Sequence, residues 1–237
     1  MDNAGYVSLS RQTALLNEMR IVANNIANAA TTGYRQEGLV FSEYIQSAPD
    51  QVSLSMTRGQ VRNTSLDQGT LTQTNGALDF AIEGDGFFLV ETANGQRLTR
   101  AGSFAPNADG DLVNHDGHRV LDAGGAPLFV PAGTAIAVAA DGTLSADGQP
   151  IGQIGVVLPS DPLSLVREDG VLFRTDGGTE PAEGSRVLQG FLESSNVNPI
   201  LQIARMIEVQ RAYEAGQNLL DTEDQRIRNA VKTLIRT

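Results

Sequence analysis

The chain has 237 residues, 41% of them hydrophobic, and a formal net charge of -11 at pH 7. This length is enough for one or two domains with a hydrophobic core, but an acidic chain whose only lysine is Lys232 has no basic field for binding nucleic acid. Because the chain has no cysteine, disulfides, thiolate metal sites and cysteine nucleophiles are excluded.

The first segment, residues 1–33, is predicted to contain an amphipathic helix. Mostly apolar positions recur at alternating steps of three and four residues, which places them on one narrow stripe, here called the N-terminal seam. The N-terminal seam comprises Leu9, Gln12, Leu16, Met19, Ala23 and Ile26. Asn24, Asn25 and Asn28 border this stripe although asparagine is a mediocre helix former, and residues 31–33 are expected to end the helix.

The same segment has no basic region followed by an apolar core and a small-residue cleavage site. We therefore expect no cleaved secretory signal. No run in the chain approaches the length of about 18 apolar residues that a membrane-spanning helix needs, so no integral membrane segment is expected.

Two β-rich stretches follow. Residues 34–75 are rich in Gln, Ser, Thr and Gly and are predicted to form an extended connector with short strands. Residues 76–190 combine short apolar runs such as LDFAI and GFFLV with Asp-Gly and Asn-Gly dipeptides, among them Asp116-Gly117 and Asp141-Gly142. Such dipeptides are typical of hairpin turns, so this part is predicted to be an antiparallel β domain.

The last segment, residues 191–237, is predicted to contain a long helix. Asn198 can cap it and Pro199 suits its first turn. Its length of about 36 residues corresponds to roughly 54 Å. A second seam, here called the C-terminal seam, comprises Met206, Val209, Tyr213, Gly216, Leu220, Glu223, Ile227, Ala230 and Leu234.

Together these elements predict an α+β fold with a mainly β centre. The N- and C-terminal helices form one discontinuous, coiled-coil-like domain, and the β domain is inserted between them. Residues 1–33 carry two acidic and two basic residues, and residues 191–237 carry six of each, so the whole negative charge lies in the middle. Neutral helical ends can pack closely with copies of themselves. The alternative is an intramolecular coiled coil with no role in assembly.

Candidate sites for chemistry are weak. His115 and His118 could share a metal, but Asp116-Gly117 between them indicates an exposed turn. An acidic loop beginning at Asn107 lacks the glutamate that a calcium loop needs at its twelfth position, and GDGFF lacks the third glycine and the helix of a dinucleotide site. We expect no enzyme activity, no cofactor, no metal and no small-molecule substrate.

Two terminal motifs resemble those of a known family. ANNIANAATTGYR resembles the N-terminal signature of the rod and hook (axial) proteins of the bacterial flagellum, with Asn24, Asn25, Asn28 and residues 32–34 matching. SSNVNPILQIARMIEVQRAYEAGQNLLDTED resembles the C-terminal signature, and LDFAIEGDGFFLV with TRAGSF is similar to the central β domain. The short connector resembles the proximal rod type; the distal rod and hook types are alternatives.

The resemblance implies a structural subunit of the flagellar basal-body rod, which assembles helically through its terminal helices and transmits torque from motor to hook. Its partners would be copies of itself, other rod subunits and the flagellar type III export apparatus, and it would reach the periplasmic rod without cleavage of a signal peptide. A non-polymerising flagellar adaptor and a glycan-binding or hydrolytic β protein are the rival interpretations.

Rod assembly would bring particular side chains to subunit contacts, and Asn24, Asn25 and Asn28 would hydrogen-bond across subunits to fix the register. The alternative is that these asparagines are solvated residues near a frayed helix end. The expected interface residues are Leu16, Met19, Ala23, Asn24, Asn25, Ile26, Asn28, Thr32, Gly33, Tyr34, Met206, Ile207, Val209, Gln210, Arg211, Tyr213, Leu220 and Ile227.

Overall fold

The computed structural model describes residues 2–46 and 54–235 and divides the chain into two compact units. Unit 1 comprises Met1–Ala27, Glu37–Asn63 and Asn198–Thr237, and unit 2 comprises Asn28–Gln36 and Thr64–Val197. Two terminal helices and a large antiparallel β region confirm the predicted α+β class with a mainly β centre.

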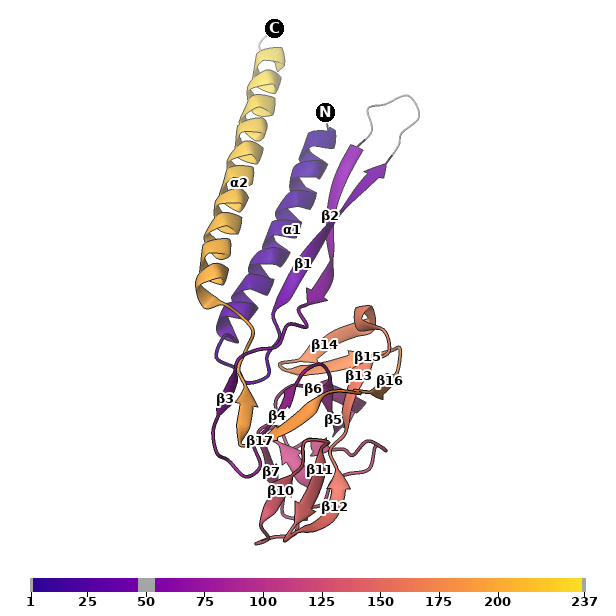
Figure 1. The fold of residues 1–237 in the computed structure, drawn as a ribbon. Helices are drawn as coiled ribbons and strands as arrows, with labels where there is room; N and C mark the ends of the chain where they lie inside the picture. Colours follow the sequence, from indigo (N-terminus) through magenta and orange to yellow (C-terminus); the bar gives the residue numbers. More distant parts are fainter. Residues whose placement is uncertain (1, 47–53, 236–237) are drawn as a thin grey trace. The chain divides into compact units, whose positions relative to one another are not determined.

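Unit 1 contains the helices α1 (Asp2–Ala27) and α2 (Pro199–Ile235) and the strands β1 (Glu37–Gln46) and β2 (Leu54–Thr64), which pair with each other (Figure 1). The predicted start of α2 is confirmed, because Asn198 Oδ1 accepts hydrogen bonds from the backbone N–H groups of Ile200 at 3.1 Å and Leu201 at 3.2 Å. Where short strands were expected in the connector, the chain forms two strands of 10 and 11 residues.

The helices α1 and α2 pack against each other in antiparallel directions. Gln12 Nε2 donates to the backbone oxygen of Tyr213 at 3.0 Å, and Arg205 Nε donates to Glu18 Oε1 at 2.7 Å. Asn25 Nδ2 donates to Gln202 Oε1 at 3.2 Å. Residue numbers therefore rise along α1 as they fall along α2, and hydrogen bonds between polar side chains fix the register.

The predicted N-terminal and C-terminal seams lie on α1 and α2, are called the α1 seam and the α2 seam from here on, and differ in burial. From Met206 to Glu223 the α2 seam is buried or half-buried, as the pattern predicts. In the α1 seam Gln12 is buried, but Leu9 is 59% exposed. The apolar residues that α1 buries are Ala14, Ile21 and Val22, which lie outside the seam. The reason is that α1 contacts both α2 and β1, so its buried face is set by two neighbours rather than by one partner helix.

Unit 2 is built from short antiparallel strands, and Phe88 lies on its central strand, β5. One nine-stranded sheet has the order β14-β15-β6-β5-β9-β8-β7, with β13 pairing to β5 and β16; β10-β11-β12, β17-β4 and β18-β3 form smaller sheets. The strands are β3 (Leu71–Gln73), β4 (Phe80–Glu83), β5 (Phe87–Thr92), β6 (Gly95–Thr99), β7 (Phe104–Pro106), β8 (Leu112–Asn114), β9 (Arg119–Val120), β10 (Ile136–Val138), β11 (Thr143–Ala146), β12 (Gln149–Gln153), β13 (Val156–Pro159), β14 (Leu165–Asp169), β15 (Leu172–Thr175), β16 (Thr179–Pro181), β17 (Arg186–Gln189) and β18 (Phe191–Glu193), with one 3₁₀ turn at Pro162–Ser164.

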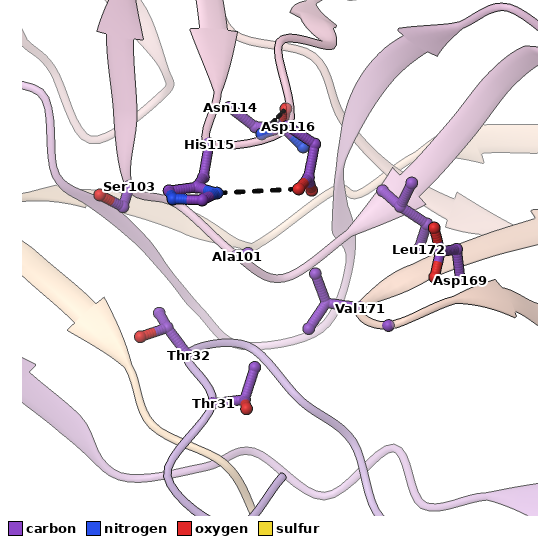
Figure 2. A pocket seen from close by; sticks show the side chains of 11 residues that line it. Thr31, Thr32, Ala101, Ser103, Asn114, His115, Asp116, Asp169, Val171 and Leu172 are labelled. Atoms are coloured by element: carbon purple, nitrogen blue, oxygen red, sulfur yellow. Dashed lines mark hydrogen bonds and ion pairs between the residues drawn. The ribbon is translucent and has the colours of Figure 1, made fainter.

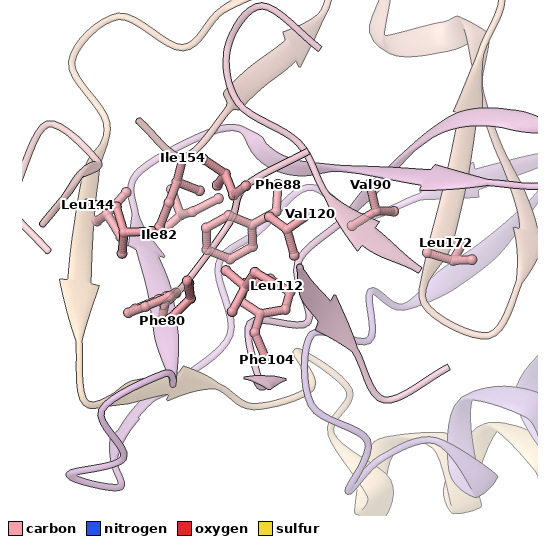
Figure 3. Close-up of a cluster of buried hydrophobic side chains, with 13 residues drawn as sticks. Phe80, Ile82, Phe88, Val90, Phe104, Leu112, Val120, Leu144, Ile154 and Leu172 are labelled. Carbon is pink, nitrogen blue, oxygen red and sulfur yellow. The ribbon is translucent and has the colours of Figure 1, made fainter. Parts of the chain in front are cut away.

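Apolar side chains from these sheets form two buried clusters, one of which is drawn in Figure 3. The ring of Phe88 lies edge-on to that of Phe104, with centroids 5.4 Å apart and an interplanar angle of 82°, a favourable arrangement for aromatic rings. The predicted turns are also present: Gly117 and Gly142 follow their aspartates with φ of 82° and 84°, values that glycine adopts at little cost.

Candidate functional site

The segment Gly33-Tyr34-Arg35 is locked into unit 2. Gly33 donates its N–H to the backbone oxygen of Glu193 at 2.7 Å and has φ of 70°. A side chain there would place Cβ 2.3 Å from Ala101 N, so only glycine fits. Tyr34 is buried, and the guanidinium carbon of Arg167 lies 4.3 Å from the centroid of its ring, in cation–π geometry.

A buried ion cluster follows directly. Glu193 bonds Arg35 at 2.9 Å and Arg100 at 3.0 Å, and all three side chains are at most 2% exposed. Gly69 N donates to Glu193 Oε1 at 2.8 Å, and Arg100 Nη2 donates to the backbone oxygen of Gly84 at 2.7 Å. Burial lowers the pKa of Arg100 to about 10 and also lowers the pKa of Arg35, while the Glu193 carboxylate opposes both shifts.

None of the three members of this cluster was predicted from the sequence. Arg35 is the last residue of the N-terminal motif, and Glu193 lies just before the C-terminal one. A charged residue within or beside each of the two motifs was the available signal. Their pairing joins positions that are far apart in the chain, which periodicity cannot reveal.

The three asparagines of ANNIANAATTGYR have separate surroundings. Asn25 is 1% exposed; its Nδ2 donates to Glu37 O at 2.8 Å, and its Oδ1 accepts from Glu37 N at 3.0 Å. Its amide thus bonds both backbone groups of the residue where β1 begins, as well as Gln202 on α2. Asn24 is exposed, and Asn28 accepts from Thr31 Oγ1 at 3.1 Å in the turn after α1.

The expected interface residues are distributed over both units, and only part of them is exposed. Among them, four are buried: Asn25, Gly33, Tyr34 and Val209. The half-buried ones are Met19, Ile26, Asn28, Thr32, Met206, Tyr213 and Leu220. The exposed ones are Leu16, Ala23, Asn24, Ile207, Gln210, Arg211 and Ile227.

Exposed apolar side chains gather along α2. Beyond Glu223 the described side chains of the α2 seam are exposed: the seam member Ile227 is 53% exposed, and Val231, one helical turn further on, is 49% exposed. Ile200, Ile203 and Ile207 form a second exposed set in its first turns, at helical spacing. Large exposed apolar patches indicate contact surfaces. Across residues 2–46 and 54–235, neither helix has the length and apolar character needed to cross a membrane.

A hollow of about 420 Å³ in unit 2 is lined by Thr31, Thr32, Asn114 and His115, among others (Figure 2). His115 is 99% exposed with Nδ1 3.7 Å from Asp116 Oδ1, and His118 N donates to Asn114 Oδ1 at 2.8 Å in the turn between β8 and β9. The predicted exposed turn is confirmed. In the part of the chain that the structure describes, no group of three or more His, Asp or Glu side chains is placed to hold a metal.

Three ranges of the chain match known protein families. Residues 6–35 match the family described as Flagella basal body rod protein, residues 81–146 the Flagellar hook protein FlgE/F/G D1 domain, and residues 188–233 the Flagellar basal body rod FlgEFG protein C-terminal family. These three matches define a protein of the flagellar rod and hook class.

Relatives that match over nearly their full length show which member of the rod and hook class this chain resembles. The flagellar basal-body rod protein FlgF of Caulobacter vibrioides is 41% identical, covering 99% of this chain and 98% of its own. The FlgF proteins of Mesorhizobium japonicum and Rhizobium meliloti are 37% and 35% identical, each with 99% of this chain and 98% of the relative covered. The chain belongs to the FlgF family of flagellar basal-body rod proteins and is a structural protein of the proximal-rod type.

Proposed function

We propose that this subunit polymerises in the basal-body rod through its terminal helices and transmits torque without catalysing a reaction. The observation that carries the proposal is that the apolar stripe of α2 continues beyond Glu223, the last of the described α2 seam residues that is half-buried. Ile227 and Val231 lie on the same helical stripe as Val209 and Leu220, which are sheltered within unit 1. Exposed aliphatic side chains at helical spacing are typical of a surface that a further helix covers.

Contact between the exposed stripe of α2 and a helix of another subunit can generate a filament. The seam on α2 and the exposed positions Leu9, Leu16 and Ala23 on α1 are different surfaces. Contact between different surfaces of successive copies is heterologous, and heterologous contacts that do not close generate helical assemblies. Other rod subunits with matching terminal helices would extend the same packing.

Membership of the family supports a proposal for how the subunit reaches the rod. We infer export through the flagellar type III apparatus and residence in the part of the rod that spans the periplasm. The acidic charge of the middle of the chain supports an outward-facing, solvated unit 2, because the neutral helices avoid repulsion at close contact.

The test replaces Ile227 and Val231 by serine and expresses this double variant in a strain from which the gene for the unsubstituted subunit has been deleted. The change should abolish motility and rod incorporation while leaving the folding of the purified subunit intact, because both side chains are exposed. The matched control is Leu163→Ser, an exposed leucine of unit 2. Deletion of residues 200–237 should also abolish incorporation. Normal basal bodies by electron microscopy from the double variant would overturn the proposal.

A further inference from the structure

A second hollow of unit 2 lies beside the buried ion cluster. It measures about 650 Å³, and its charged lining residues are Arg35, Arg100, Asp67, Asp85 and Glu180. Apolar wall residues are Leu66, Phe87, Leu158, Pro159 and Pro162. A volume of this size is typical of small-molecule sites, which combine apolar walls with a few polar groups.

Arg35 and Arg100 supply more positive charge than their buried partner can balance. Both guanidiniums share the single carboxylate of Glu193. Arg100 Nε and Arg35 Nε are buried and have no hydrogen-bond partner among the described atoms. Unsatisfied buried donors are costly, and guanidinium donors match carboxylate oxygens in geometry and charge. The cluster is therefore suited to a second carboxylate.

Three carboxylates line the same hollow and are exposed: Asp67, Asp85 and Glu180. Asp85 interacts electrostatically with both buried arginines. A simple anion entering the hollow would be repelled by the exposed carboxylates, and a simple cation would be repelled by the guanidiniums. A ligand that carries both charges meets an opposite charge at each end.

We propose that this hollow binds a small zwitterionic ligand of the amino-acid or short-peptide class, with its carboxylate toward Arg35 and Arg100 and its ammonium toward Asp67, Asp85 and Glu180. The apolar walls accept small aliphatic substituents. The same pair of charges could also come from adjacent lysine and glutamate side chains of a partner protein. This site is independent of the helical contacts proposed for rod assembly.

The test titrates the full-length, isotope-labelled subunit with dialanine and follows the backbone amide resonances of Gly86 and Phe87. We expect saturable shifts, and about tenfold weaker binding when either end of dialanine is blocked by acetylation or amidation. Acetyl-lysyl-glutamyl-amide supplies the same charges within a blocked chain. If that blocked peptide binds more tightly than dialanine, the natural ligand is a pair of side chains of a partner protein. If dialanine binds more tightly, the natural ligand is a free amino acid or short peptide.

Asp85→Asn should weaken dialanine binding by about tenfold. Asp109→Asn removes an equal charge at an exposed position that does not line this hollow, and it should leave binding unchanged. The absence of saturable shifts, equal binding of dialanine and its amide, or equal effects of the two substitutions would each overturn the proposal.

Discussion

At the scale of single residues, Glu193 is the most consequential side chain of unit 2. Its carboxylate pairs with two arginines that are as buried as it is. Glu193→Gln would leave both guanidiniums without their buried counter-charge, so we expect the free energy of unfolding to fall by about 3–5 kcal/mol, the usual cost of breaking a buried pair from one side. Urea unfolding of the purified subunit measures it.

The control for this prediction is Glu183→Gln, because Glu183 is an exposed glutamate of the same unit. It should change the stability by less than about 0.5 kcal/mol. Similar effects of the two substitutions would contradict the importance assigned to the buried ion cluster.

The carboxylate of Asp141 makes the folding stability of the subunit depend on pH. Its Oδ1 accepts from Thr143 N and its Oδ2 from Thr143 Oγ1, each at 2.9 Å, and these bonds lower the pKa of Asp141. Because the folded pKa is below the unfolded value of 3.8, the stabilisation is complete above that value and is lost as the pH falls through the folded pKa. Asp141→Asn should therefore lower Tm at neutral pH, and the difference from the unsubstituted chain should close in acid. A constant difference across that range would show that the charge does not contribute.

At the scale of elements, Asn25 joins α1 to both β1 and α2. Asn25→Ala removes the hydrogen bonds to Glu37 and Gln202 from a buried site and should destabilise unit 1 by about 1–3 kcal/mol, despite the better helix propensity of alanine. Asn24→Ala is the matched control: the side chain is adjacent but exposed. Helical circular dichroism in urea measures both. A smaller loss for Asn25 than for Asn24 would contradict this role.

The elements also show which features a sequence can predict. The start of α2 was predictable because its cap depends only on neighbouring residues, Asn198 and Pro199. The hairpins were predictable because glycine after aspartate favours positive φ. The buried face of α1 was not, because β1 supplies a second packing surface. The contact between Arg35 and Glu193 was not either, since nothing local specifies a partner so distant in sequence.

At the scale of the whole molecule, unit 1 and unit 2 are stabilised internally by different kinds of contact. Unit 2 buries two clusters of aliphatic and aromatic side chains, centred on residues such as Phe88 and Phe173. Each such side chain contributes about 1.5–3 kcal/mol on burial. Among the described side chains of unit 1, the buried apolar ones are Ala14, Ile21, Val22 and Val209. Polar contacts, including Arg205 with Glu18, supply much of the remaining helix pairing.

This difference predicts that the subunit opens in two stages before assembly. In dilute monomer, amides of residues 14–25 and 206–223 should exchange with solvent faster than those of β5 and β6, because local opening of the helix pair exposes less apolar surface than opening of the β core. Hydrogen exchange followed by mass spectrometry resolves the two sets. Incorporation into rods should slow exchange in the helices, including residues 225–235, because neighbouring helices then cover the α2 seam. Equal protection of helices and strands in the monomer would mean that unit 1 needs no neighbours for its stability.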